Sequence, residues 1–385
     1  MGIVSVLVPL YLVQELGGSL IDLGVMMFAS AASVIPASVF LGRLPDRYRR
    51  AKPFIVASFA GVSLVLFLMP LVSSVTIFQV SYVMMNLVAY LKGPSTGVLI
   101  AESFERSERS SVLARLGFVE GIGGAAGLAF CSLTVNYLGY KTLLKLTGPL
   151  VVASVLLCLS AMYDPPIYME RFLDRLDRLT GSIETFSYHL TDRGSLAPNW
   201  KWRGHEPNMA IFGLGTVFFA FAASNAFTSL PVYLLVRAKL PTSTIFTSFL
   251  VRSVFGATTF LVSSRWVGSE GSSIVKLGTL MRIILVILLP PTVMLPMPYT
   301  VVGITAILSA IAFSWSLYSV GVDTVTLTYA SQGSLGVYDA LTGIGGAAGA
   351  FTGGLIPTLF SFEVLFMVSS GLFAFALLLF ILGLK

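Results

Sequence analysis

Charged side chains within long apolar stretches are the residues of this sequence best able to do chemistry: Lys92, Glu120, Arg252 and Asp339. A charge inside a membrane is costly unless it is paired or hydrated, so each is a candidate for ion coupling. Lys92 and Glu120 lie at similar distances before and after one basic loop. We therefore expect a Lys92–Glu120 pair in which Glu120 can take up a proton. A purely structural ion pair is an equal alternative, and Glu120–Arg252 is a rival pairing.

The positions of Asp339 and Arg282 along their spans give two further interpretations. Asp339 can lie near the end of its span, as a negative charge at a helix N-terminus, instead of pairing. Arg282 follows the predicted start of its span, residue 277, closely enough for its side chain to reach the membrane surface.

Membrane-spanning helices must hold these charges, because the composition excludes a soluble protein. Of 385 residues, 56% are hydrophobic and 11% are charged, with mean hydropathy +0.88. A soluble domain has about 25% charged residues, and a spanning helix needs about 20 apolar ones. The long apolar stretches also exclude a barrel, whose strands alternate in polarity. Twelve spans are predicted, at 2–14, 22–41, 53–72, 76–101, 112–136, 142–162, 209–236, 242–263, 277–294, 299–326, 334–358 and 363–384.

Other classes of function find no support in the sequence. The net charge of +6 comes from short loops between spans, so no nucleic-acid partner is expected. Cys131 and Cys158 lie in apolar spans, and His189 and His205 share one central segment, so no metal site or cofactor is predicted. No phosphate loop, serine-hydrolase or zinc-protease motif occurs, and we expect no enzyme.

One polar segment divides the spans six and six. We expect domains at residues 1–163 and 208–385, joined by a linker at 164–207. The linker contains an amphipathic pattern, typical of a helix on the membrane surface or of a solvated linker helix. Basic residues are concentrated in the linker and in the loops after spans 2 and 4, which places these segments and both termini in the cytoplasm. A multi-pass protein of the cytoplasmic membrane is predicted.

The chain also repeats itself. Residues 121–127 and 343–349 both read Gly-Ile-Gly-Gly-Ala-Ala-Gly, and Pro9-Leu-Tyr-Leu is matched by Pro231-Val-Tyr-Leu. The differences 343 − 121 and 231 − 9 both equal 222, which indicates a duplicated six-span unit of parallel halves. The glycine-rich stretches favour close helix packing. Span 1 is shorter than span 7, its counterpart at this offset, and it is too short to cross a bilayer. We therefore expect a truncated N-terminus.

The loop after span 2 reads Gly42-Arg-Leu-Pro-Asp46-Arg47-Tyr-Arg-Arg50-Ala-Lys52. It resembles the signature loop of the major facilitator superfamily in position and spacing, and the twelve-span layout agrees. The resemblance implies an all-helical fold of two six-helix bundles and a cytoplasmic latch formed by Gly42, Asp46, Arg47 and Arg50. The alternative is that these basic residues only set the topology. The second half has lost the acid of this loop, so any latch is one-sided.

The same resemblance implies a central cavity lined by spans 1, 4, 7 and 10. Its polar and aromatic candidates are Tyr11, Asn86, Tyr90, Asn225, Trp315 and Tyr318, although each fits a packing role as well. Few charges lie in these spans, which favours a neutral, amphipathic or weakly charged substrate.

The function predicted from these observations is secondary active transport of a small solute by rocker-switch alternating access. A proton is the expected co- or counter-ion, with export favoured over uptake. The expected partners are a small-molecule substrate and the lipid bilayer, and the chain is expected to be a monomer. A non-transporting sensor or scaffold on the same fold is the alternative.

Overall fold

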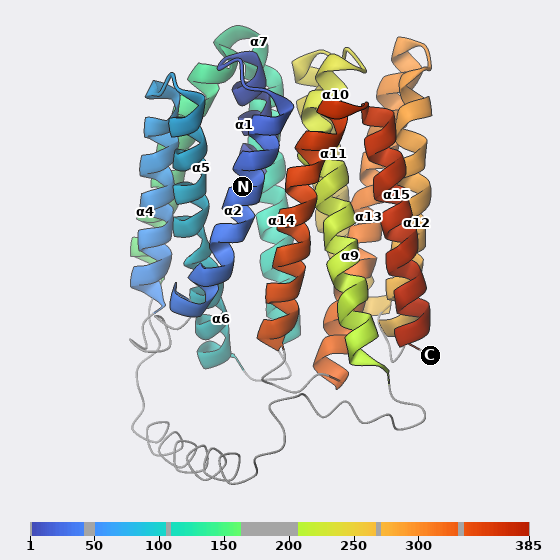
Figure 1. Cartoon of the computed structure of the whole chain (residues 1–385). Helices are drawn as coiled ribbons and strands as arrows, with labels where there is room; N and C mark the ends of the chain where they lie inside the picture. Colours follow the sequence, from blue (N-terminus) through green and yellow to red (C-terminus); the bar gives the residue numbers. More distant parts are fainter. Residues whose placement is uncertain are drawn as a thin grey trace, which may run out of the picture.

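The computed structural model describes residues 2–41, 51–104, 109–162, 207–266, 271–329 and 335–384. Every regular element in these residues is a helix, and the helices stand side by side in an upright bundle (Figure 1). We refer to residues 2–162 as the N half and to residues 207–384 as the C half. The fold is all-helical, as predicted.

The helices of the two halves follow the predicted spans. The N half contains α1 (Val4–Gln14), α2 (Leu20–Leu41), α4 (Lys52–Leu68), the short 3-10 helix η1 (Met69–Leu71), α5 (Val75–Tyr90), α6 (Lys92–Ser103) and α7 (Arg109–Ala161). The C half contains α9 (Met209–Thr228), α10 (Leu230–Val236), α11 (Thr242–Trp266), α12 (Gly271–Val293), α13 (Met297–Tyr329), α14 (Leu335–Leu359) and α15 (Phe362–Gly383).

Helix α7 accounts for two predicted spans. Gly139 has φ 69° and ψ 168° within it, a conformation that interrupts the helix and that side chains other than glycine rarely adopt. Eight stretches of the described helices are long and apolar enough to cross a membrane, and the longest, Arg115–Ala161, contains this break. Counted as two, and together with α1, α11 and α14, they correspond to the twelve predicted spans.

Span 4 is broken where the sequence predicted one helix. α5 ends at Tyr90 and α6 begins at Lys92. Pro94 has no N–H to donate to the carbonyl of Tyr90, and its ring crowds that carbonyl, so the helix cannot continue regularly. The Leu91 N–H instead donates to the Val88 carbonyl at 3.2 Å, which tightens the turn. Lys92 therefore lies directly at a break in its span.

Two ends of the bundle can be distinguished by the residues that close the helices. At one, here named the Gly17 end, Gly17 (φ 66°) ends the turn after α1 and Lys239 (φ 51°) ends the turn after α10. The Gly18 N–H donates to Leu12 at 2.9 Å, and Leu240 donates to Leu234 at 3.1 Å. These residues are 222 apart in both cases, so the two turns are copies of one C-terminal cap.

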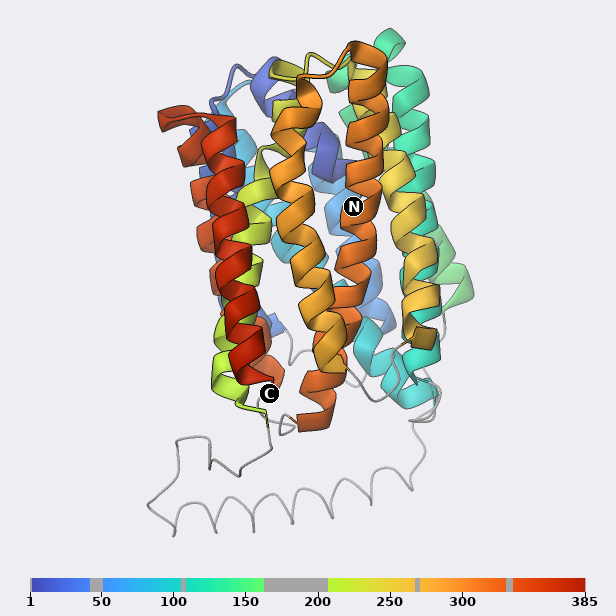
Figure 2. The ribbon, with the colours of Figure 1, turned by 90° about the vertical axis from the view of Figure 1, so that its right-hand side faces the viewer.

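The opposite end is named here the Asn208 end. The side chain of Asn208 accepts hydrogen bonds from the N–H groups of Ala210 (3.1 Å) and Ile211 (3.3 Å), which starts α9. The Asn208 N–H donates to the Gly383 carbonyl at 2.8 Å, so the last turn of α15 lies beside the start of α9. Both views show the C-terminus at this end (Figures 1 and 2).

The glycine-rich stretches pack as equivalent contacts of the two halves. A Cβ on Gly121 of α7 would lie 2.7 Å from Ala257 of α11, and one on Gly343 of α14 would lie 3.6 Å from Ile35 of α2. Ala257 and Ile35 are themselves 222 residues apart. The small-residue helix of each half therefore packs against the second span of the other half. This equivalence confirms the sequence repeat and the two pseudo-symmetric bundles.

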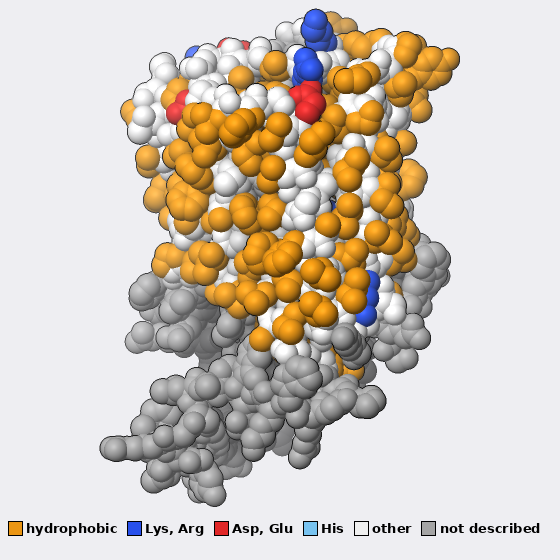
Figure 3. Space-filling model, turned by 45° about the vertical axis from the view of Figure 1, so that its right-hand side comes forward, with side chains coloured by type: hydrophobic (Ala, Val, Ile, Leu, Met, Phe, Trp, Pro, Cys, Tyr) orange, Lys and Arg blue, Asp and Glu red, His pale blue; other side chains and the backbone are white. Residues whose placement is uncertain are grey.

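The flanks of the molecule are apolar. Leu133, Val302 and Met367 are 74%, 69% and 70% exposed. On the face in Figure 3, hydrophobic side chains cover the flank, and the few Lys, Arg, Asp and Glu side chains lie mainly toward the Gly17 end. Such a surface is suited to lipid rather than to water.

Candidate functional site

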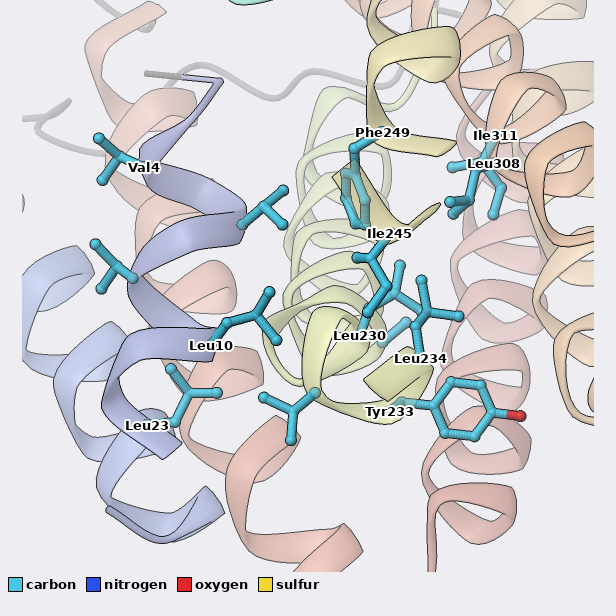
Figure 4. Packing of buried hydrophobic residues seen from close by; sticks show 14 of the residues in the cluster. Val4, Leu10, Leu23, Leu230, Tyr233, Leu234, Ile245, Phe249, Leu308 and Ile311 are labelled. Carbon is cyan, nitrogen blue, oxygen red and sulfur yellow. The ribbon is translucent and has the colours of Figure 1, made fainter. Parts of the chain in front are cut away.

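The centre of the bundle is filled with apolar side chains toward the Gly17 end. One buried cluster joins both halves, with residues from α1, α2, α10, α11 and α13 (Figure 4). Its members include Leu10, Leu23, Leu230, Ile245 and Leu308, each at most 1% exposed. The two halves are therefore packed against each other at this end.

The same face of α13 becomes exposed toward the Asn208 end. Ile304, Leu308 and Ile311 succeed one another at helical spacing and are fully buried. Trp315, one turn further on, is 42% exposed. In the N half, Tyr82 is buried, and Gly93, at the position equivalent to Trp315 (315 − 93 = 222), is exposed. Both halves thus change from buried to exposed at the same depth.

The structure brings Lys92 and Glu120 together. The Lys92 Nζ forms an ion pair with Glu120 Oε1, and the Lys92 ammonium lies 5.8 Å from the centre of the Phe59 ring. The two side chains are 35% and 49% exposed. Glu120 directly precedes Gly121, which contacts the C half through Ala257. The pair is therefore placed beside both the break in span 4 and the contact between the halves.

The alternative partner, Arg252 of α11, does not pair with Glu120. Its guanidinium lies 5.5 Å from the Phe249 ring, and no carboxylate of the described residues forms an ion pair with it. Asp339 is the fifth residue of α14, and the position of its side chain lies outside what the structure describes.

Three of the predicted cavity residues are buried. Tyr11 is 2% exposed and its ring lies 5.3 Å from that of Phe78, within the buried apolar cluster. Tyr318 is 6% exposed and stacks on Phe219 at 3.4 Å between ring centres. Asn225 is fully buried inside the C half.

Asn225 occupies a hydrogen-bond network between three helices. Its Nδ2 donates to Ser369 Oγ of α15 at 2.9 Å, and its Oδ1 accepts from Thr352 Oγ1 of α14 at 2.8 Å. Both ends of the amide are thus used by protein groups, an arrangement that holds helices together.

The remaining cavity candidates are more accessible. Asn86 and Tyr90 are half-buried on α5, and the Asn86 amide donates to the Tyr82 carbonyl at 2.9 Å. Trp315 is the exposed member of the set. Gly42, Asp46, Arg47 and Arg50 of the predicted latch lie outside the described residues, as do residues 163–206 of the predicted linker.

Arg282 lies at a different depth from the one that its sequence position predicted. The prediction that it reaches the membrane surface is wrong, because its side chain is 2% exposed. Helix α12 begins at Gly271, six residues before the predicted start at 277, so Arg282 is central in the helix. The polar run Gly-Ser-Ser before Ile274 has the composition of a loop, so the sequence pattern did not indicate that α12 starts there. The intramembrane charge alone was the signal that could have found it.

Comparison with known proteins supports one family. The profile of the Major Facilitator Superfamily matches residues 1–336. No curated protein matches the chain. These residues include α1 to α13, so the match covers most of the chain.

Several solved structures share the fold at low sequence identity. The nucleoside transporter NupG is 13% identical, with a TM-score of 0.73, over 100% of this chain and 96% of that chain. The xylose transporter XylE from E. coli is 14% identical, with a TM-score of 0.66, over 98% and 93%. The human organic anion transporter MFSD10 is 17% identical, with a TM-score of 0.61, over 94% and 83%. The duplicated bundles, the family profile and this shared fold lead to one conclusion: the chain belongs to the Major Facilitator Superfamily and is a membrane transporter.

Proposed function

We propose that this chain carries a small solute across the cytoplasmic membrane by rocker-switch alternating access, with protons as the coupling ion. The proposed moving bodies are residues 1–163 and 208–385, in a monomer. Two supporting features are the apolar closure at the Gly17 end and the exposed Trp315 and Gly93 faces beyond it. A path that is closed at one end and exposed toward the other is what one state of an alternating-access carrier requires.

The Asn208 end is assigned to the cytoplasm, with both termini there. The loops rich in Lys and Arg follow spans 2 and 4, which end at this side of the bundle. Lys52 and Lys276, at the start of α4 and α12, donate to the backbone carbonyls of Leu159 and Leu384 at 2.8 Å each. The structure is then inward-facing, the state described for the similar XylE structure.

Proton coupling is carried by one observation, the Lys92–Glu120 ion pair at the break in span 4. Protonation of Glu120 removes its charge and releases Lys92, so α6 can tilt about the break near Leu91 relative to α7. Because both side chains are partly exposed, protons reach the pair from the side that is open. The loop of Gly42, Asp46, Arg47 and Arg50 is assigned the latch that holds the opposite state.

The test is uptake by the full chain in proteoliposomes, with and without an imposed pH gradient. The solute panel starts from the classes named for the similar structures: nucleosides, xylose and organic anions. Wild-type protein is expected to accumulate its solute only with the gradient. Glu120→Gln is expected to lose that accumulation, by about tenfold, while retaining exchange of labelled for unlabelled solute.

Glu363→Gln is the matched control. Glu363 accepts from Arg237 at the Gly17 end, with 2.9 Å between Nη2 and Oε1, so this variant also breaks an ion pair but away from the path. It is expected to accumulate solute as the wild type does. Gradient-driven accumulation that survives Glu120→Gln contradicts Glu120 as the coupling site. Transport of every solute at equal rates with and without the gradient contradicts coupling itself.

A further inference from the structure

A cation that has no acidic partner among the described residues is buried inside the C half. Arg282 lies eleven residues from both Gly271 and Val293, the two ends of α12. At 1.5 Å per residue this is about 16 Å from either end, too far for the side chain to reach water there. With 2% exposure, its charge is held within the bundle. Burying a charge in a membrane span costs free energy, and for this reason alone Arg282 is a functional candidate.

The described surroundings of Arg282 offer no negative charge. Its Nε donates to Ser314 Oγ at 3.2 Å, and its Nη2 contacts the Ile311 carbonyl at 3.5 Å. Four aromatic rings surround the guanidinium, with centres 5.1 to 5.9 Å from Cζ: Phe219, Phe227, Trp315 and Phe373. Neutral oxygens and ring faces stabilise a cation but leave its charge uncompensated.

A second cation adds to the positive potential. Arg252 of α11 is close enough to Arg282 to repel it electrostatically, and it also has no ion-pair partner among the described residues. Asp323, on α13 toward the Asn208 end, is exposed and interacts electrostatically with Tyr318. The charge of Lys92 in the N half is already neutralised by Glu120. The excess positive charge therefore belongs to the C half.

Among the four rings around Arg282, Trp315 is the exposed one. Its indole ring lies 5.1 Å from the guanidinium carbon on one side, while 42% of the residue is exposed. It contacts only the rings of Phe219 and Tyr318 among the described aromatic residues, at 6.2 and 5.8 Å. Trp315 is therefore the ring whose rotation we expect to uncover the guanidinium.

We propose that Arg282, with Trp315 as its cover, is a binding subsite for the anionic group of the transported solute. A guanidinium matches a carboxylate through paired hydrogen bonds, and the surrounding rings match a flat apolar body. The substrate class is therefore an organic monocarboxylate on a planar apolar frame. This assignment rests on the proposed transport function, and it replaces the neutral substrate favoured by the sequence.

The experiment measures binding to the purified full chain in detergent, without any gradient. Trp200, Trp202 and Trp266 are replaced by Phe, so that Trp315 is the one remaining tryptophan of the four. The probes are benzoate and 2-naphthoate, each against its neutral alcohol, benzyl alcohol or 2-naphthalenemethanol. Saturable quenching of Trp315 is expected with the carboxylates, with affinities about tenfold or more above those of the alcohols.

Variants separate binding from packing. Arg282→Gln is expected to remove the preference for the carboxylate, while Arg282→Lys keeps the charge and loses only part of the affinity. Arg237→Gln, which removes a cation at the Gly17 end, is the matched control and binds as wild type. If Arg282→Gln does not fold, the subsite is still tested by the Lys variant and by the carboxylate–alcohol comparison on otherwise wild-type protein.

Equal affinity for each carboxylate and its alcohol overturns the subsite, as does undiminished carboxylate preference in folded Arg282→Gln. Because this readout needs no transport, Glu120→Gln is expected to bind benzoate normally. If wild-type transport ignores the pH gradient while carboxylate binding is retained, only the proton mechanism is contradicted. If only neutral solutes are taken up with coupling, only the anion subsite is contradicted.

Discussion

The two halves of the molecule share their packing but differ in their intramembrane charges. The caps at Gly17 and Lys239 and the contacts of Gly121 and Gly343 repeat at an offset of 222. The charges do not repeat: Lys92 corresponds to Ser314, and Arg282 corresponds to Ala60. The positions that hold helices together are therefore alike in the two duplicated halves, whereas the charged positions within the membrane differ. We assign the switching pair to the N half and solute binding to the C half.

The surroundings of the repeated glycines Gly345 and Gly123 differ among the described residues, and this gives the largest expected effect. A Cβ on Gly345 would lie 2.4 Å from the Val217 carbonyl oxygen of α9, whereas one on the equivalent Gly123 meets nothing within 4 Å. Gly345→Ala must separate α14 from α9 and is expected to cost about 1–3 kcal/mol. Gly123→Ala is expected to be neutral or stabilising by up to about 1 kcal/mol.

The measurement for this pair is the unfolding temperature of each purified variant in detergent. The two variants control for one another, because each changes the same residue type in the same heptapeptide. Similar unfolding temperatures for both would show that the halves do not differ here.

The next effect concerns Asn225, whose equivalent in the N half is the apolar Ile3. Asn225→Ala leaves Ser369 and Thr352 without their buried amide partner, which is expected to cost about 1–2 kcal/mol. Thermal unfolding again reports it. Asn86→Ala, which loses one bond to a carbonyl on its own helix, is the milder control. A larger loss in that control would contradict the difference in polarity between the halves.

The smallest expected effect is the contribution of the Lys92–Glu120 pair to stability. Since each of the two side chains is more than a third exposed, their coupling energy is expected to be below about 1 kcal/mol. A double-mutant cycle of Lys92→Met and Glu120→Gln in thermal unfolding measures it. A much larger value would favour the structural ion pair over the proton switch.

Residue patterns predicted the helices and the repeat better than the placement of side chains. The apolar blocks and the matched heptapeptides were sufficient for twelve spans and parallel halves, because lipid demands long apolar helices. The Lys92–Glu120 pair followed from equal distances to one loop. Burial of Tyr318 and Asn225 did not follow, since helical depth alone does not determine which face a residue presents.

Arg282 shows most clearly where such prediction fails. An error of six residues in the start of α12 turned a central cation into one near the surface. The break at Leu91 was also missed, although Pro94 four residues after Tyr90 was a readable signal. Boundaries within polar runs depend on tertiary packing, which one sequence does not display.

The contact between α2 and α14 near the Gly17 end has a mechanical consequence. Gly24 and Gly354 meet backbone to backbone, with an added Cβ on Gly24 only 3.0 Å from the Gly354 Cα. At this point the two backbones touch without a side chain between them, so the crossing is suited to serve as a fulcrum. Leu41 is 17 residues from Gly24 along α2, a lever arm of roughly 25 Å. A tilt of about 10° at the crossing then moves that far end by roughly 4 Å, enough to admit or exclude a small molecule.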